Sequence, residues 1–304
     1  MLVGVSGTYG SGYEEVGKCL ARNHGFETVK LASFEDNWTL LKDFATANYA
    51  QRYVLIGMSD VEMVRGLEQM PGFVHLAVDA PLDRKVKLCD GDHVTYIKGA
   101  LAHDSAEQLE VCRRADVQVY VASSPEEFLG RLEAVLEEIV LCQLGGGNVM
   151  SPKRPSWDTY FMKLAKLAAS RSNCMKRRVG CVIVRDCRVI ATGYNGTPRN
   201  LTNCNAGGCP RCNGGESSLQ SCLCLHAEEN ALLEAGRDRV GQNAILYCDT
   251  CPCLTCSVKI VQTGVSEVVY SQSYRMDKDS FDVLERGGVK VRQFSSIEEH
   301  KYVI

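Results

Sequence analysis

The chain has 304 residues, of which 45% are hydrophobic and 23% charged, and its formal net charge is −3 at pH 7. This composition is typical of globular proteins and excludes an intrinsically disordered chain, and the length predicts two domains. Proteins that bind a polyphosphate backbone usually carry a basic excess. The slight acidic excess therefore counts against DNA or tRNA as substrate, although a local basic patch is compatible with it.

The chain also contains 16 cysteines. Residues 1–7 lack the charged start of a signal peptide, and no apolar run is long enough to span a bilayer. Without a secretory signal, many cysteines indicate a reducing compartment in which thiolates are available to metal ions. We therefore expect an intracellular protein, in the cytoplasm and with the nucleus as a further location, and no membrane partner.

Residues 1–142 are predicted to form a first domain of the α/β class. Short apolar runs separated by helical patterns predict buried strands, and the domain ends in a segment with the periodicity of an amphipathic helix. The predicted strands are residues 2–6, 53–57, 73–78 and 117–121, and the final helix is residues 126–141.

The turn after the first strand has the spacing of a phosphate-binding P-loop. Gly7 and Gly12 fit G-x-x-x-x-G between a strand and a helix. A working loop continues with Lys and then Ser or Thr, which hold phosphate and magnesium. Here Tyr13 supplies no cation, and Glu14 would repel a phosphate. The loop is therefore predicted to be degenerate.

This first part, including residues 79–83 after a strand, resembles small P-loop nucleoside-phosphate kinases. With its degenerate loop, we expect a retired kinase-like fold that serves packing, assembly or regulation. Binding of a nucleotide without hydrolysis stays open. Nucleotide kinase activity is the disfavoured alternative, and phosphoryl transfer by residues 1–150 would test it.

Residues 143–155 are predicted to be a linker, because three consecutive glycines and two nearby prolines lie there. Residues 156–304 form the second predicted domain, in which a helix capped by Ser156 precedes a hairpin over 180–184 and 188–193. The strands expected after the hairpin are 244–248, 267–270 and 289–292, alternating with helices that begin near 226, 253 and 278. This order predicts a mixed sheet with helices on both faces.

Two short segments of the second domain carry metal-binding and acidic residues. His226 and Glu228 give H-x-E, and Pro252, Cys253 and Cys256 give P-C-x-x-C. Together they form the known signature of zinc-dependent nucleobase deaminases. Two cysteines at a helix start converge on one point, where the helix dipole favours thiolates. With His226 as the third ligand, a tetrahedral zinc keeps one position for water.

Glu228 is predicted to be the catalytic acid and base. Zinc lowers the pKa of a bound water, so hydroxide is available near neutral pH. A carboxylate two residues from a ligand can take that proton and deliver it to the ring nitrogen and then to the departing ammonia. A zinc-ordered scaffold without catalysis is an alternative class of function. Glu228 argues against it, because a scaffold does not need an acid beside an open metal position.

From residue 156 to about residue 294, the chain closely resembles deoxycytidylate (dCMP) deaminases of the fungal kind. The motifs are R-S-N-C at 171–174, V-G-C-V-I-V at 179–184, G-Y-N-G at 193–196 and the two zinc segments. The resemblance implies a cytidine-deaminase-like three-layer α/β/α fold and hydrolytic deamination of dCMP to dUMP and ammonia, which supplies dUMP for thymidylate synthesis. It also implies a homohexamer, activated by dCTP with Mg²⁺ and inhibited by dTTP. The N-terminal kinase-like extension also looks like that of the fungal enzymes.

By the same resemblance, three further residues match nucleotide-linked positions. Asn195 matches a nucleotide contact, Tyr274 a tyrosine that holds the substrate 5′-phosphate, and Arg237 an interface arginine linked to allosteric nucleotide. Plain structural roles stay open: a turn residue, a core residue and a solvated helix end, respectively. The alternative function is a zinc deaminase of another cytosine or adenine substrate, including a base in RNA or DNA. Turnover of free dCMP, and none of oligonucleotides, would separate the two.

A second group of cysteines precedes the active-site helix. Its members are Cys174, Cys204, Cys209, Cys212, Cys222 and Cys224. A glycine-rich loop with little core of its own is ordered by a metal, so a structural zinc is predicted. Local spacing favours Cys209 and Cys212 with Cys222 and Cys224. The resemblance instead implies the positions that hold a second zinc in bacterial and phage-like members. That set, which we predict, is Cys174, Cys204, Cys209 and Cys222, with Cys212 and Cys224 as alternatives.

Overall fold

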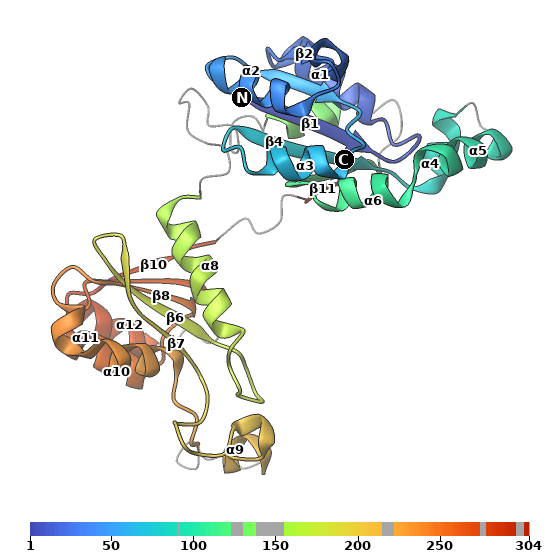
Figure 1. Cartoon of the computed structure of the whole chain (residues 1–304). Helices are drawn as coiled ribbons and strands as arrows, with labels where there is room; N and C mark the ends of the chain where they lie inside the picture. Colours follow the sequence, from blue (N-terminus) through green and yellow to red (C-terminus); the bar gives the residue numbers. More distant parts are fainter. Residues whose placement is uncertain are drawn as a thin grey trace. The chain divides into compact units, whose positions relative to one another are not determined.

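The computed structural model describes residues 1–89, 92–122, 130–137, 155–214, 222–273, 278–295 and 301–303. The chain forms two compact units, which are Met1–Arg154 with Ile297–Ile304, and Pro155–Ser296 (Figure 1). The sequence assigned the chain end to the second domain, and this was wrong. Strand β11 (Lys301–Val303) pairs in parallel with β5 (Val117–Tyr120) of the first unit.

A six-stranded parallel sheet forms the centre of the first unit, in the order β11-β5-β4-β1-β3-β2. The remaining strands are β1 (Leu2–Gly7), β2 (Glu27–Val29), β3 (Tyr53–Ile56) and β4 (Phe73–Asp79). The four strands predicted here are confirmed. The sequence missed β2 and β11 because each has only three residues and no apolar run.

Helices cover both faces of this sheet. They include α1 (Tyr13–Asn23), α2 (Trp38–Ala47), α3 (Val61–Glu68), α4 (Leu82–Leu88), α5 (His93–His103) and α6 (Ala106–Arg113), with a 3-10 turn η1 (Leu31–Phe34). Val16 and Leu20 of α1 pack in one core, and Leu41 of α2 and Val64 of α3 pack in the other. Residues 130–137 are helical. The rest of the predicted 126–141 helix, and the predicted linker except residue 155, lie outside the described residues.

The second unit is built on a five-stranded mixed sheet in the order β10-β9-β8-β6-β7. Its strands are β6 (Gly180–Arg185), β7 (Arg188–Tyr194), β8 (Ile245–Thr250), β9 (Glu267–Gln272) and β10 (Lys290–Gln293). Strand β6 is antiparallel to both its neighbours, and β8, β9 and β10 are parallel. The predicted hairpin and mixed sheet are confirmed.

Helix α8 (Trp157–Ala169) covers one face of this sheet, while α10 (Ala227–Val240), α11 (Leu254–Thr263) and α12 (Lys278–Arg286) cover the other (Figure 1). Each face has its own buried cluster, with Phe161 and Tyr247 on the α8 side and Ala231 and Ile260 on the other. The predicted three-layer α/β/α architecture is therefore confirmed. Within the described residues, no helix is long and apolar enough to cross a membrane.

The start of α10 is set directly against β7 by a glycine. A Cβ atom added to Gly193 would lie 2.2 Å from the carbonyl oxygen of Ala227 and 2.5 Å from the backbone nitrogen of Ala231. Only glycine permits this close backbone approach. The sheet therefore fixes the first turn of α10, which carries His226 and Glu228.

Candidate active site and metal-binding residues

Three side chains from two helix starts converge on one point. His226 is the N-cap residue of α10, and Cys253 is the N-cap residue of α11, with Cys256 in its first turn. His226 Nδ1 lies 3.3 Å from the Sγ atoms of both cysteines. A tetrahedral zinc holds a nitrogen and a sulfur ligand about 3.5 Å apart. The three residues therefore fit a zinc ion, through Nδ1 of the histidine.

The protonation of the two cysteines also suits a cation. A hydrogen bond from Cys256 lowers the pKa of the Cys253 thiol to about 3, against the opposing effect of burial. The same hydrogen bond and burial raise the pKa of Cys256. The pair thus shares one proton, which a divalent cation replaces when both sulfurs become ligands. Glu229 fixes the histidine backbone, because its Oε2 accepts from the N–H of His226 at 3.0 Å.

Glu228 lies in the first turn of α10 and is 4% exposed. Burial raises its pKa to about 7. A carboxyl group with a pKa near the working pH both accepts and donates protons efficiently. Glu228 is not in the group of ligand atoms formed by His226, Cys253 and Cys256. The arrangement therefore matches a three-ligand metal with a separate proton carrier.

A cavity of about 380 Å³ joins these residues to the cysteine-rich loop. His226, Glu228 and Cys253 line it, together with the cationic side chains of Lys176 and Arg211. Arg177 also lines it and donates to Gln272 Oε1 at 3.0 Å. The Nε atom of Arg211 is buried and has no hydrogen-bond partner among the described residues. Cations gathered around a cavity of this size suit a small anionic ligand.

The basic residues of this cavity were only partly anticipated. The sequence shows the run Lys176-Arg177-Arg178, and the structure places the first two, not the third, on the cavity. Arg211 was missed as a site residue. Its only sequence signal was its place between Cys209 and Cys212, which a metal would order.

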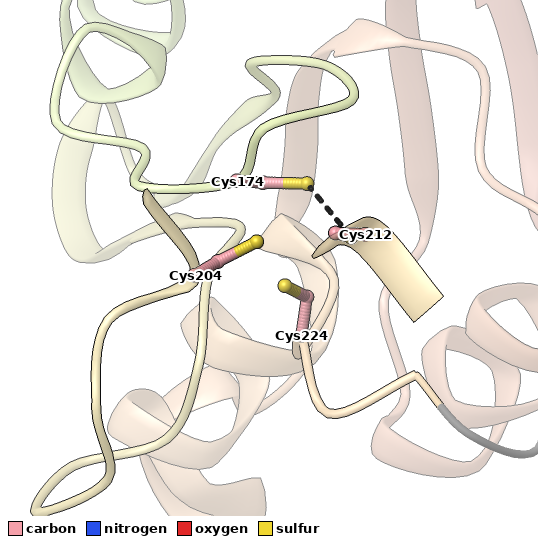
Figure 2. A group of neighbouring side chains, drawn as sticks. All are labelled: Cys174, Cys204, Cys212 and Cys224. Carbon is pink, nitrogen blue, oxygen red and sulfur yellow. Dashed lines mark hydrogen bonds between the residues drawn. The ribbon is translucent and has the colours of Figure 1, made fainter. Parts of the chain in front are cut away.

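The six cysteines of the loop fall into two overlapping groups of four that share Cys212 and Cys224. In each group all sulfurs lie within 4.8 Å of one another. The first group is Cys174, Cys204, Cys212 and Cys224, and the second is Cys209, Cys212, Cys222 and Cys224. Figure 2 shows the sulfurs of Cys174, Cys204 and Cys224 turned toward a common space beside Cys212, which lies on the short helix α9 (Pro210–Asn213). Neither group is the predicted set of Cys174, Cys204, Cys209 and Cys222. The second is the set that local spacing favoured.

Known proteins resemble the whole chain. Deoxycytidylate deaminase of Saccharomyces cerevisiae is 54% identical over 318 aligned residues, covering 100% of both chains. The chain belongs to the deoxycytidylate deaminase family. The deoxycytidylate deaminase of Schizosaccharomyces pombe is 44% identical and covers 96% of this chain and 97% of its own. Residues 155–272 match the model of the cytidine and deoxycytidylate deaminase zinc-binding region.

A solved structure of the cyanophage S-TIM5 dCMP deaminase in complex with dCMP and dUMP is 35% identical, with a TM-score of 0.40. It covers 46% of this chain and 98% of its own. The yeast members of the family, in contrast, extend over both units of the chain. The first unit is thus a shared part of these deoxycytidylate deaminases.

Of the two nucleotide-linked residues suggested by the family that the structure describes, Asn195 lines the cavity and Arg237 does not. Asn195 is 8% exposed, and its Oδ1 accepts from Ser172 Oγ at 2.6 Å and from the N–H of Val179 at 2.8 Å. Its Nδ2 donates to the carbonyl of Arg177 at 2.8 Å, so Asn195 braces the basic segment. Arg237 is exposed on α10 after a kink at Gly236, away from the cavity lining. Tyr274 lies outside the described residues.

The glycine-rich turn of the first unit is engaged by the chain's own carboxylates. The N–H of Tyr9 donates to Asp104 Oδ1 at 2.8 Å. Thr8 Oγ1 donates to Asp79 Oδ1 at 2.6 Å, and Lys85 Nζ lies 2.6 Å from the same oxygen. Groups that cradle phosphate in a P-loop are therefore paired internally here, which agrees with the loss of the usual Lys and Ser or Thr.

Proposed function

We propose that this chain is a zinc-dependent hydrolase that converts dCMP and water to dUMP and ammonia. The observation that carries the proposal is the buried Glu228 beside the convergent atoms of His226, Cys253 and Cys256, in a cavity that is also lined with cations. The two yeast relatives described above are both called deoxycytidylate deaminase and align with this chain over almost their full length, which supports the same activity.

The chain's own residues account for the proton transfers. The catalytic zinc, when held by His226, Cys253 and Cys256, supplies a water of lowered pKa. Glu228 takes a proton from that water and passes it to the cytosine ring nitrogen. It then takes the second proton of the added water, as the new carbonyl forms, and delivers it to the leaving amino group, which departs as ammonia. Its pKa of about 7 lets one carboxyl group serve both steps near neutral pH.

The substrate is proposed to be a monophosphate. Lys176, Arg177 and Arg211 lie around the same cavity as the metal residues, and the buried Nε of Arg211 needs an acceptor. A 5′-phosphate supplies charge and hydrogen-bond acceptors to such a cluster. Asn195 and Tyr274 are retained as proposed nucleotide contacts on the strength of the family resemblance.

Steady-state assays on dCMP, CMP, deoxycytidine and a cytosine-containing oligonucleotide test this function. We expect turnover of dCMP, with kcat/KM for deoxycytidine lower by about 10²-fold or more, since two or more charge-assisted hydrogen bonds to the phosphate are lost. Turnover of the oligonucleotide without turnover of free dCMP would overturn the proposal in favour of a deaminase of bases in RNA or DNA.

Regulation and assembly belong to the same proposal. We infer a cytoplasmic homohexamer that dCTP with Mg²⁺ activates and dTTP inhibits, with Arg237 at a subunit interface. The exposure of Arg237 on α10 supports this, because its guanidinium is available to another subunit or a nucleotide. The first unit serves packing, assembly or regulation, and a structural zinc orders the cysteine loop. Sedimentation with and without each effector, together with dCMP assays, tests the assembly and its feedback.

A further inference from the structure

The two four-sulfur groups of the loop share two members, Cys212 and Cys224. Cys212 comes from α9, and Cys224 from the segment before α10. The other sulfurs form two outer pairs, Cys174 with Cys204 (Figure 2) and Cys209 with Cys222. Two tetrahedra that share one edge have this arrangement of six corners.

We propose that the loop binds two zinc ions, with Cys212 and Cys224 each bridging both ions. Two sulfurs around one tetrahedral zinc lie about 3.8 Å apart. Cys174 Sγ lies 3.9 Å from Cys212 Sγ, and Cys209 Sγ lies 4.0 Å from Cys222 Sγ. Each distance falls within a different group, so both groups have the spacing of zinc ligands. Six thiolates for two zinc ions is also the ratio of Zn₂Cys₆ modules.

A single ion leaves two cysteines without a role. If the ion were held by the first group, Cys209 and Cys222 would remain as a close thiol pair, and Cys209 is 0% exposed. If it were held by the second group, Cys174 and Cys204 would remain, and Cys204 is also 0% exposed. Two ions use all six sulfurs. Each thiol that becomes a ligand releases its proton to solvent.

The surroundings of the sulfurs suit anionic ligands. The N–H of Met175 donates to Cys204 Sγ at 3.4 Å, and the N–H of Leu223 donates to Cys209 Sγ. Hydrogen bonds to metal-bound sulfur stabilise its negative charge. Six thiolates and two zinc ions leave a net negative charge, and Arg211 lies between two of the ligands in sequence. A two-ion centre would thus also hold Arg211 on the cavity wall.

Packing does not order this loop by itself. The hydrophobic clusters of the second unit include none of the described residues 196–214 and 222–224. The only regular structure there is η2 (Cys204–Ala206) and the four-residue α9. Loops without a core of their own depend on metal binding for their fold. Two ions joined by shared ligands tie together α9, η2, the segment after α8 and the segment before α10.

Metal analysis of the full chain tests the proposal. We expect three zinc ions per chain, one catalytic and two in the loop. The double variant Cys209→Ser/Cys222→Ser should retain two, because the first group still holds one ion. The matched control Cys89→Ser/Cys187→Ser removes two cysteines outside both groups and should retain three. Two ions in the wild type would show a single loop ion and overturn the proposal, whether the double variant keeps both ions, as a single ion in the first group predicts, or loses one, as a single ion in the second group predicts.

A second measurement needs no variant. In the wild-type chain exchanged with ¹¹³Cd, bridging sulfurs should give two loop resonances that are coupled to each other. Two uncoupled resonances, or one loop resonance, would overturn the shared-ligand arrangement. Because the proposal goes beyond the proposed function and neither readout uses dCMP, its failure is separate from a failure of the deaminase assignment, which dCMP turnover measures directly.

Discussion

Replacing Glu228 by glutamine removes the proposed proton carrier and keeps the shape of the side chain. Glu228 is 4% exposed on the first turn of α10, and its pKa is raised to about 7. Near pH 7 its acid and base forms are therefore both well populated. Glutamine fills the same space but neither accepts nor delivers a proton at this pH. The change isolates proton transfer from packing.

The size of the effect follows from this role. A positioned general acid or base contributes about 10² to 10⁴ in rate, which corresponds to roughly 3 to 5 kcal/mol of activation free energy. Because Glu228 is assigned both proton transfers, we expect Glu228→Gln to lower kcat for dCMP by at least about 10³-fold. The free energy of unfolding should change little, since a neutral glutamine replaces a carboxyl group that burial already disfavours as an anion.

The assay combines dCMP turnover with zinc analysis of the same preparation. Zinc content should be unchanged, because Glu228 is not in the ligand group of His226, Cys253 and Cys256. Glu234→Gln is the matched control, since Glu234 is exposed on the same helix, and it should retain wild-type kcat. A Glu228→Gln variant with full zinc and kcat within tenfold of wild type would refute the proton-carrier role. Loss of zinc would refute the separation of this residue from the ligands.

Three other substitutions probe the pocket and its support. Arg211→Gln should raise KM for dCMP by about tenfold, because one charge-assisted hydrogen bond to the substrate is lost. Arg178→Gln is the control and should leave KM unchanged, because Arg178 does not line the cavity. The same KM for both variants in steady-state assays would contradict this role of Arg211. Gly193→Ala should lower the free energy of unfolding by about 1–3 kcal/mol in urea titration, because its Cβ meets α10 backbone. Asp158→Asn should lower the free energy of unfolding by about 1–2 kcal/mol in the same titration, because Arg292 donates to both Asp158 oxygens, at 2.6 and 3.1 Å. An unchanged unfolding midpoint would argue against a stabilising role for this ion pair.

Much of the two sheets could be predicted because most of their strands are either short apolar runs or, as in β5, alternate apolar and polar residues. The composition of Val117–Tyr120 and Gly180–Arg185, together with their flanking turns, predicts that each is a strand. Strand β11 could not be found in this way, because its pairing partner lies far back in the sequence. Only tertiary structure brings a short segment at the chain end beside β5. Its edge position is a matter of long-range hydrogen bonding, which local composition does not encode.

The residues of the proposed active site could be named from the sequence alone. His226 and Glu228 are two residues apart, and Cys253 and Cys256 are three apart, so the start of one helix sets the relative positions within each pair. The ligand preferences of zinc then predict that the two pairs meet. The cysteine loop is the opposite case, because its six sulfurs come from segments up to 50 positions apart. Which sulfurs meet depends on how those segments fold back on one another. Only the tertiary structure separated them into two groups that share Cys212 and Cys224, because distance between remote segments is not a property of spacing along the chain.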